Sequence, residues 1–285
     1  MAGIQIRHGQ PGSAAEPWVA IAPADLAGRA ALLRVTLAAG EEIAPRRCVG
    51  GEVGLYLAAG GLAVATGAGE AELEAGDLAI LGPETSFSVR AGAPGATLLM
   101  MPVPGTAGVL PTQAVEPGGA MALVPASGGT PTVLAGDLYI VKRRAAETGR
   151  RLGLLHFAIP PGGGPIPHVH HMEDEAFYVL DGTLSLYADG LRTHAGAGSL
   201  IFLPRGLPHG FHNLTQAPAA MLCLLSPGGG EQFFVEAGRP PGVEGATGKP
   251  DPAEIARILA VADRYGVAMR PDIADPYLPP PGATP

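Results

Sequence analysis

The sequence predicts an all-β protein made of two similar domains in tandem, followed by a C-terminal helix. Two observations support this prediction. The chain has 43 Gly and 30 Pro among 285 residues, and most of them interrupt apolar runs at turn-like intervals. Short strands separated by Gly/Pro-rich turns are typical of a β-barrel or a β-sandwich. In addition, glycines repeat at one fixed offset, which indicates an internal duplication.

The duplication has an offset of 122 residues. The segment GLYLAAGG at 54–61 matches AFYVLDGT at 176–183 in this register. Three glycine pairs keep the same offset: Gly40 with Gly162, Gly60 with Gly182, and Gly76 with Gly198. We therefore expect one copy of a β-domain at 1–110 and a second copy at 131–235, joined by a Pro- and Gly-rich linker at 111–130.

Residues 236–285 are predicted to form a loop and a helix. Asp251 suits the N-cap, Pro252 suits the first helical position, and Gly266 is a stop signal. Apolar residues at helical spacing share one face of this helix: Ile255, Ile258, Leu259 and Ala262. We expect this face to pack against a barrel.

The composition excludes several classes of partner. Only 15% of the residues are charged, the net charge is −8, and no basic patch is evident, so nucleic acid and anionic membranes are not expected to bind. The first residues do not resemble a signal peptide, and no apolar run approaches the ~18 residues of a membrane-spanning helix. Two cysteines make no disulfide framework, and we expect a reduced, cytoplasmic setting.

The stretch PHVHHMEDEAFYVLDG at 167–182 concentrates imidazole and carboxylate groups before an apolar strand. His168 and His170 are two residues apart, so an extended strand directs both to one side. Glu175 begins an alternating strand and is able to join them in a barrel interior. Neutral imidazoles and carboxylates are ligands of transition metals. On this spacing alone, a surface histidine pair is an equally good interpretation.

A second stretch, GSLIFLPRGLPHGFHN at 198–213, predicts a strand, a turn and a returning strand. The strand ends near Pro204, the turn contains Gly206, and His209 begins the return. His209 is therefore placed to supply a fourth ligand from a neighbouring strand.

Together the two stretches resemble the two sequence motifs of the cupin superfamily. The first motif is matched by Gly162, His168, His170, Glu175 and Gly182, and the second by Gly198, Pro204, Gly206, His209 and Asn213. The resemblance implies a bicupin, with two jelly-roll-like β-barrels in tandem. It also implies one divalent transition metal (Fe, Mn, Ni, Co or Cu) held by His168, His170, Glu175 and His209.

The first copy lacks these ligands. At the offset of 122, the four ligand positions are occupied by Arg46, Cys48, Val53 and Phe87. We expect this copy to be a degenerate, metal-free cupin with a structural or dimer-forming role, so that each chain holds one metal. A pocket-forming or ligand-sensing role is the alternative.

Other residues are candidates for the substrate pocket. Phe177 and Phe211 each follow a ligand by two residues, and His156 lies on the approaching strand. Each of the three is also compatible with an ordinary place in a strand or core. Glu173 and Asp174 are expected to be solvated turn residues.

The second copy resembles the quercetinase-like dioxygenases within the cupins. The shared features are a GD-x-Y motif at Gly136, Asp137 and Tyr139 and an ETG turn at Glu147, Thr148 and Gly149. This resemblance implies a divalent metal such as iron, O2 as co-substrate, and opening of the central ring of a flavonol with release of CO. Glu175 would then act as both metal ligand and general base.

Two alternatives stay open at this stage. A non-oxidative isomerase, cyclase or dehydratase of a natural-product intermediate would use the same metal and base without O2. A non-catalytic bicupin that binds a small molecule is the third hypothesis. In every case the expected partner is a small molecule. A homodimer is also compatible with the sequence.

Overall fold

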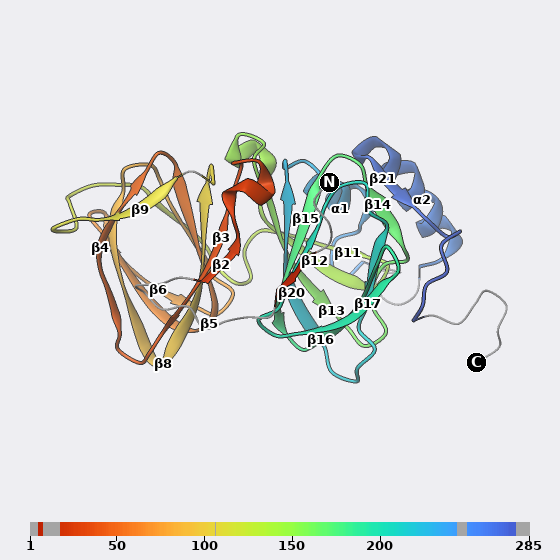
Figure 1. The fold of residues 1–285 in the computed structure, drawn as a ribbon, viewed down its shortest axis with the longest axis horizontal. Coiled ribbons are helices and arrows are strands. Elements are labelled where there is room, and N and C mark those ends of the chain that lie inside the picture. Colours follow the sequence, from red (N-terminus) through yellow and green to blue (C-terminus); the bar gives the residue numbers. More distant parts are fainter. Residues whose placement is uncertain (1–4, 8–17, 106, 244–249, 278–285) are drawn as a thin grey trace. The chain divides into compact units, whose positions relative to one another are not determined.

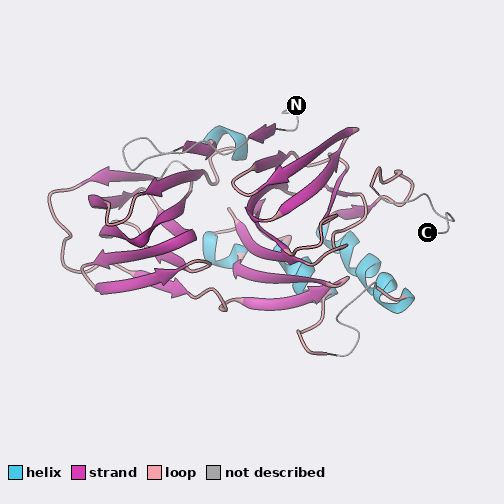
Figure 2. Cartoon of the chain, turned by 90° about the horizontal axis from the view of Figure 1, so that it is seen from below, coloured by secondary structure: helices cyan, strands magenta, loops and turns pink. Residues whose placement is uncertain are grey.

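The computed structural model describes residues 5–7, 18–105, 107–243 and 250–277 (Figure 1). The chain divides into two compact units. The first barrel is the unit Gln10–Gly129, and the second barrel is the unit formed by the chain from Thr130 onward together with the N-terminal strand β1. Strands dominate both units and the helices are few (Figure 2), which confirms the all-β fold class.

The first barrel is built from one nine-stranded antiparallel sheet that curves around an apolar core. Its path runs β10-β7-β5-β8-β3-β2, with β4 pairing β8 and β9, and β6 pairing β5. The elements are β2 (Trp18–Ile21), η1 (Pro23–Leu26), β3 (Leu32–Leu37), β4 (Glu42–Val49), β5 (Glu52–Thr66), β6 (Gly69–Glu74), β7 (Leu78–Leu81), β8 (Ser86–Val103), β9 (Gly108–Pro111) and β10 (Met121–Val124).

The second barrel consists of a seven-stranded and a five-stranded sheet. Their orders are β1-β18-β15-β20-β13-β12-β11 and β17-β16-β19-β14-β21. The elements are β1 (Gln5–Arg7), β11 (Thr130–Leu134), β12 (Asp137–Arg143), η2 (Ala145–Thr148), β13 (Gly153–Ile159), β14 (His168–His170), β15 (Asp174–Asp181), β16 (Thr183–Ala188), β17 (Leu191–Gly196), β18 (Leu200–Leu203), β19 (His209–His212), β20 (Ala219–Ser226), α1 (Glu231–Ala237), α2 (Pro252–Ala262), η3 (Asp263–Tyr265) and β21 (Val267–Met269).

The repeated glycines mark equivalent bends in the two barrels. Gly60 lies at a bend within β5, and Gly182 separates β15 from β16. Both have positive φ, +88° and +74°. A Cβ at Gly60 would lie 2.0 Å from the carbonyl oxygen of Gly95, and one at Gly182 would lie 2.9 Å from Cα of Ala219. Only glycine fits both the conformation and the space, so the glycine pairs preserve a fold that turns the strand from one layer into the next.

Two segments group differently from the domain ranges expected from the sequence. β1 pairs antiparallel with β18, with Ile6 opposite Ile201, so it extends a sheet of the second barrel rather than the first. The segment expected as a linker contains β10, which pairs with β7 at the edge of the first barrel. Both are edge additions that satisfy open backbone groups of a sheet.

Helix α2 begins as the sequence predicts, since the Asp251 side chain accepts a hydrogen bond from the backbone N–H of Glu254 at 2.7 Å. Its expected buried face is wrong in part. Ile255 and Leu259 are 45% and 49% exposed, whereas Val261 and Ala262 are buried. The buried face also includes Glu254, whose carboxylate accepts a hydrogen bond from Ala135 N at 3.2 Å. Among the described residues, no helix is both long enough and apolar enough to cross a membrane.

Candidate metal centre

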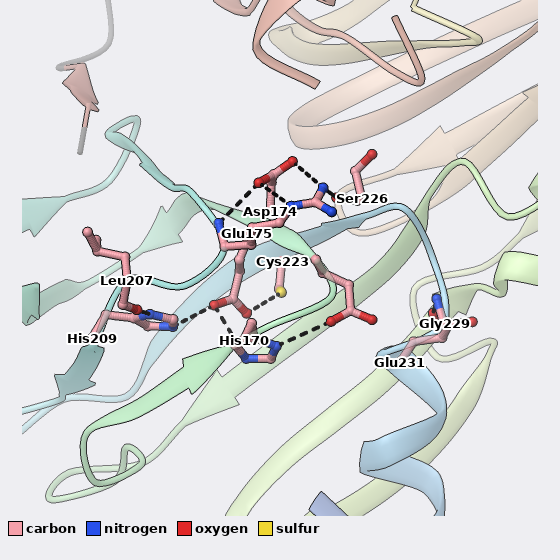
Figure 3. Close-up of polar contacts among 11 residues, drawn as sticks. His170, Asp174, Glu175, Leu207, His209, Cys223, Ser226, Gly229 and Glu231 are labelled. Carbon is pink, nitrogen blue, oxygen red and sulfur yellow. Dashed lines mark hydrogen bonds and ion pairs between the residues drawn. The ribbon is translucent and has the colours of Figure 1, made fainter. Parts of the chain in front are cut away.

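Three strands of the second barrel bring His168, His170, Glu175 and His209 together. Their potential ligand atoms all lie within 4.8 Å of one another, and all four side chains are buried. The antiparallel pairing of β14 with β19 sets His168 opposite His209, with ring centroids 4.4 Å apart. Glu175 reaches the cluster from β15 in the other sheet. His170 and His209 both approach the Glu175 carboxylate (Figure 3).

The non-ligand residues of the two motifs fix the loops around this cluster. Gly206, at φ +81°, donates its N–H to the His170 carbonyl at 2.7 Å, which ties the turn before His209 to β14. Asn213 is fully buried and donates its side-chain amide to Ile159 O at 3.0 Å and Ala217 O at 2.8 Å. These bonds explain why the motifs extend beyond the ligands themselves.

Backbone carbonyls orient two of the three imidazoles. His168 Nδ1 lies 3.0 Å from Ile166 O, and His209 Nδ1 lies 2.9 Å from Leu207 O. A carbonyl oxygen only accepts hydrogen bonds, so both Nδ1 atoms must carry the proton. In the neutral form of each ring, Nε2 then carries a lone pair directed into the cluster, which is the tautomer that a metal ligand needs.

The short contact between His209 and Glu175 indicates that a proton or a metal ion lies between their facing atoms. His209 Nε2 lies 2.8 Å from Glu175 Oε2. An imidazole lone pair and a carboxylate oxygen repel each other at this distance unless a proton or a metal ion shares them. His170 Nε2 lies 3.8 Å from the same oxygen. The donor set of three nitrogens and one oxygen therefore suits a divalent transition metal.

The electrostatics favour the ligand forms of His168 and Glu175. Burial, together with the neighbouring His209 and His170, lowers the pKa of His168 to about 3, which keeps the ring neutral. Burial alone would raise the pKa of Glu175, but His170 and the hydrogen bond with His209 outweigh it and lower that pKa to about 2. Burial also opposes the charged form of His170, yet Glu175 and Glu173 raise its pKa above the ordinary value.

Cys223 is a neighbour of the cluster that the sequence did not reveal. It lies on β20, faces the barrel interior, and donates from Sγ to Glu175 Oε1 at 3.2 Å (Figure 3). Burial and the Glu175 carboxylate raise the pKa of this thiol well above its usual value, so it stays a neutral donor. The two oxygens of Glu175 are thus divided, with Oε2 toward the histidines and Oε1 toward the thiol.

Glu173 is the second residue that the sequence did not reveal, and its expected place in a solvated turn is wrong. Its side chain is 4% exposed, and Oε2 lies 3.7 Å from His170 Nδ1. Asp174 instead turns outward and forms a two-point contact with Arg205. Strand alternation is the signal that was available, because Glu173 and Glu175 are two residues apart and share one face.

The aromatic candidates for the pocket lie inside the barrel with the cluster. The ring centroid of Phe177 lies 6.5 Å from that of His209 and 5.4 Å from that of Phe211. His156 does not face the cluster. It lies on the opposite face of β13 from the core residues Leu155 and Phe157, because neighbouring side chains on a strand alternate. Burial and nearby Lys142 lower the pKa of His156 to about 4.

The GD-x-Y motif anchors the loop that leads to β14. Asp137 Oδ2 accepts hydrogen bonds from the Tyr139 hydroxyl at 3.2 Å and from Gly164 N at 3.0 Å. Burial raises the pKa of Asp137 to about 7, although these two hydrogen bonds oppose the shift. Tyr139 packs against Phe157, with ring centroids 4.6 Å apart.

The ETG turn is likewise a structural anchor. Thr148 Oγ1 donates to Leu152 O at 2.6 Å and so closes the turn before β13. Glu147 accepts a hydrogen bond from the backbone N–H of Arg144 at 2.7 Å. The residues of the GD-x-Y motif and the ETG turn position the strands and loops of the second barrel. Neither motif contributes a residue to the four-residue cluster.

The equivalent positions of the first barrel form an apolar core. Arg46 lies opposite Phe87 in the ladder, as His168 lies opposite His209. Cys48, Val53 and Phe87 are buried in one hydrophobic cluster, and burial with the nearby Glu84 raises the pKa of Cys48 to about 12. Within the described part of the first barrel, no group of three or more His, Cys, Asp or Glu side chains converges as a metal site.

Residues 155–225, which contain all four clustered side chains, match the family model described as the Cupin domain. This segment is a cupin domain. The two-barrel chain also resembles solved bicupin structures. Oxalate decarboxylase from Bacillus subtilis has a TM-score of 0.54 at 15% identity, covering 70% of this chain and 69% of that one. The formate complex of the Lactobacillus farciminis enzyme has a TM-score of 0.53 at 14% identity, covering 69% and 76%. At such identities the likeness concerns the fold, and the chain has the bicupin fold.

Curated relatives match shorter parts of this bicupin. Quercetin 2,3-dioxygenase from Bacillus subtilis is 28% identical over 125 residues, which is 44% of this chain and 37% of that protein. The tetracenomycin polyketide synthase protein TcmJ from Streptomyces glaucescens is 26% identical over 83 residues, covering 29% of this chain and 56% of that protein. The chain therefore spans less than two thirds of the length of either relative.

Proposed function

We propose that the cupin domain of the second barrel holds one divalent transition metal and is a quercetinase-like dioxygenase site for a flavonol-like or other enolic aromatic substrate. His168, His170, Glu175 and His209 would hold the metal. The observation that carries the proposal is the convergence of their ligand atoms within 4.8 Å in a buried interior.

The donor set limits the metal without selecting one. Three imidazole nitrogens and one carboxylate oxygen accept iron, manganese, nickel, cobalt or copper. A solved structure of the fold relative from Bacillus subtilis, oxalate decarboxylase, is described by its Mn(II) centres. When bound, the metal would supply Lewis acidity toward an enol or enolate oxygen of the substrate.

Glu175 is the residue that would receive the substrate's proton. Its lowered pKa keeps the carboxylate ionised but makes it a weak base, so the substrate's enolic O–H would need to be acidified by the bound metal before its proton passes to a carboxylate oxygen, leaving the electron pair on the substrate oxygen. The Cys223 thiol already contacts Oε1, so it would hold the orientation of the carboxylate during this transfer.

The aromatic side chains beside the cluster suit a planar substrate. Phe177 and Phe211 make an edge-to-face pair with ring centroids 5.4 Å apart, and Phe157 lies 6.2 Å from Phe177. Such apolar walls would pack against an aromatic ring and exclude water from the activated substrate. The similarity to quercetin 2,3-dioxygenase supports O2 as the co-substrate.

A second candidate is a non-oxidative isomerase, cyclase or dehydratase of a polyketide-like enol. The observation that favours it is the similarity to TcmJ, whose name places it with a polyketide synthase. The same cluster and the same carboxylate would serve this reaction without O2.

An oxygen electrode coupled to CO detection separates the two candidates. The metal-loaded protein is mixed with a flavonol in air and under anaerobic conditions, with His209→Ala as the matched blank. We expect O2 uptake and CO release in equal amounts, and no reaction without oxygen. Turnover that proceeds equally well without O2 would replace the dioxygenase by the non-oxidative candidate.

A further inference from the structure

The three histidines of the cluster are oriented in two different ways. His168 and His209 each direct Nδ1 to a backbone carbonyl two residues earlier, at 3.0 Å and 2.9 Å. His170 does not follow this pattern. Its Nδ1 faces Glu173 Oε2 at 3.7 Å, across one turn of the chain between β14 and β15.

Glu173 is a buried carboxylate, and it needs a hydrogen-bond donor or an opposite charge nearby. Its side chain is 4% exposed, and a buried carboxylate is costly unless hydrogen bonds or an opposite charge compensate it. Among the described residues, neither Glu173 Oε2 nor His170 Nδ1 has a hydrogen-bond partner. The two unsatisfied atoms therefore face each other, one a potential donor and the other an acceptor.

The surroundings leave room for this carboxylate. Gly230 lies beside it, and a Cβ at that position would lie 3.2 Å from Glu173 Oε1. A larger residue at position 230 would press against the carboxylate. The fold thus keeps a narrow space in which Glu173 stays next to the ring of His170.

We propose that Glu173 is a positioning residue for His170, with its carboxylate accepting the Nδ1–H bond and fixing the ring that directs Nε2 to the metal. The inference rests on the proposed metal site. Closing the 3.7 Å separation to the 2.7–2.9 Å of a charge-assisted hydrogen bond needs a movement of about 1 Å, which a side-chain rotation supplies. A carboxylate on the far nitrogen orients a ligating imidazole and raises its basicity.

The consequence is an unequal set of ligands. His168 and His209 are held by neutral carbonyls, whereas His170 has a carboxylate at each ring nitrogen, Glu173 at 3.7 Å and Glu175 at 3.8 Å. His170 should therefore be the strongest donor of the three. Loss of the Glu173 charge should weaken metal binding even when the fold is intact.

The test compares Glu173→Gln and Glu173→Ala with Asp174→Asn as the matched control. Asp174 is the adjacent acid, but it turns outward to Arg205, so its substitution makes the same charge change away from the metal. Co(II) affinity is measured by competition with a chelator, and the visible absorption of bound Co(II) reports the geometry at the metal. We expect roughly 10-fold weaker binding for Glu173→Gln, 10–100-fold weaker binding for Glu173→Ala, and a changed spectrum in both. Asp174→Asn should stay within about 2-fold of the unmodified protein.

Affinities and spectra of both Glu173 variants equal to those of Asp174→Asn would overturn the inference. If Glu173→Ala does not fold, the near-isosteric Glu173→Gln decides alone. His209→Ala is measured in parallel to separate this failure from that of the metal site. If His209→Ala binds Co(II) as tightly as the unmodified protein, the metal site itself is misassigned.

Discussion

The two barrels keep the same ladder register and differ in what fills their centres. Phe87 and Val53 occupy the first barrel with hydrocarbon, where the second has His209 and Glu175. Arg46, at the position of His168, donates to the carbonyl of Ala44 at 3.2 Å instead of pointing inward to a cluster. An apolar filling stabilises a barrel, whereas buried polar donors cost free energy unless they are paired or bind a cation. The second barrel therefore keeps a costly arrangement that a metal would compensate.

The likeness extends to strands outside the segment that matches the Cupin domain. β9 pairs with β4 in the first barrel, with Cys48 opposite Val109. β21 pairs with β14 in the second, with His170 opposite Val267. An added strand covers the equivalent edge in both barrels, so this support is part of the duplicated frame rather than a feature of the metal site alone.

The largest expected effect is on metal content, when a ligand of the second barrel and its apolar counterpart in the first barrel are each replaced by alanine in separate variants. His209→Ala should lose most of the bound metal, because three remaining groups hold a divalent ion far less well. Phe87→Ala, the matched change in the first barrel, should keep the metal while lowering the free energy of unfolding by about 3–5 kcal/mol. Elemental analysis and denaturant unfolding measure the two effects. Full metal occupancy in His209→Ala would remove the distinction between the barrels.

Glu175→Gln should separate the ligand role from the base role. The amide keeps a neutral oxygen for the metal but cannot accept the substrate's proton, so turnover should fall by roughly 10²-fold or more with metal retained at reduced affinity. Steady-state kinetics at full metal loading check this. Near-normal turnover would show that Glu175 serves as a ligand and that another group takes the proton.

Metal affinity should depend on pH in the second barrel. The pKa of His168 is lowered to about 3, so this ring stays neutral as the solution is acidified. The pKa of His170 is raised, so a proton competes with the metal there, and affinity is lost as pH falls through that pKa. We expect roughly tenfold weaker binding per pH unit once the pH falls below the raised pKa of His170, so the loss begins above the pH at which an ordinary histidine would be protonated. Chelator titrations between pH 5 and 8 measure it, and a constant affinity over this range would contradict the assignment of His170.

The smallest expected effect concerns Cys223. It lies opposite Phe177 in the ladder, where the first barrel has Met100 opposite Leu55. Cys223→Ala removes the donor to Glu175 Oε1 and should lower turnover by up to about 10-fold with metal retained, since one hydrogen bond to a charged group is lost. Cys223→Ser keeps a donor and should recover most of that loss. Equal rates for the alanine and serine variants would show that the thiol does not orient Glu175.

Much of the candidate site could be predicted from the sequence because strand alternation and motif spacing are local. The intervals around His168, His170, Glu175 and His209 place these side chains on inward faces, and the structure brings them together. Glu173 follows the same alternation but stands among other acids, which made a solvated turn the simpler interpretation. Its burial depends on the path of the chain after β14, which local spacing does not determine.

Other features depend on long-range contacts that leave no local pattern. β1 has three residues, and nothing in QIR indicates that it pairs with β18 rather than with a strand of the first barrel. Helix α2 buries Val261 and Ala262 and exposes Ile255 and Leu259, and the buried Glu254, which accepts a hydrogen bond from Ala135 N, lies on the same face as Val261. The direction of His156 could not be assigned from the sequence, because the sequence does not show which alternate residues of β13 face the barrel interior.

The number of metal ions per chain tests the contrast between the two barrels most directly. The unmodified protein is loaded with excess Mn(II), Fe(II) or Co(II), freed of loosely bound ions, and measured by elemental analysis against amino-acid analysis of the same sample. One tightly bound ion per chain, lost in His209→Ala and kept in Phe87→Ala, is the predicted result. Two ions per chain, or one ion that persists in His209→Ala, would contradict the assignment of the metal to the second barrel.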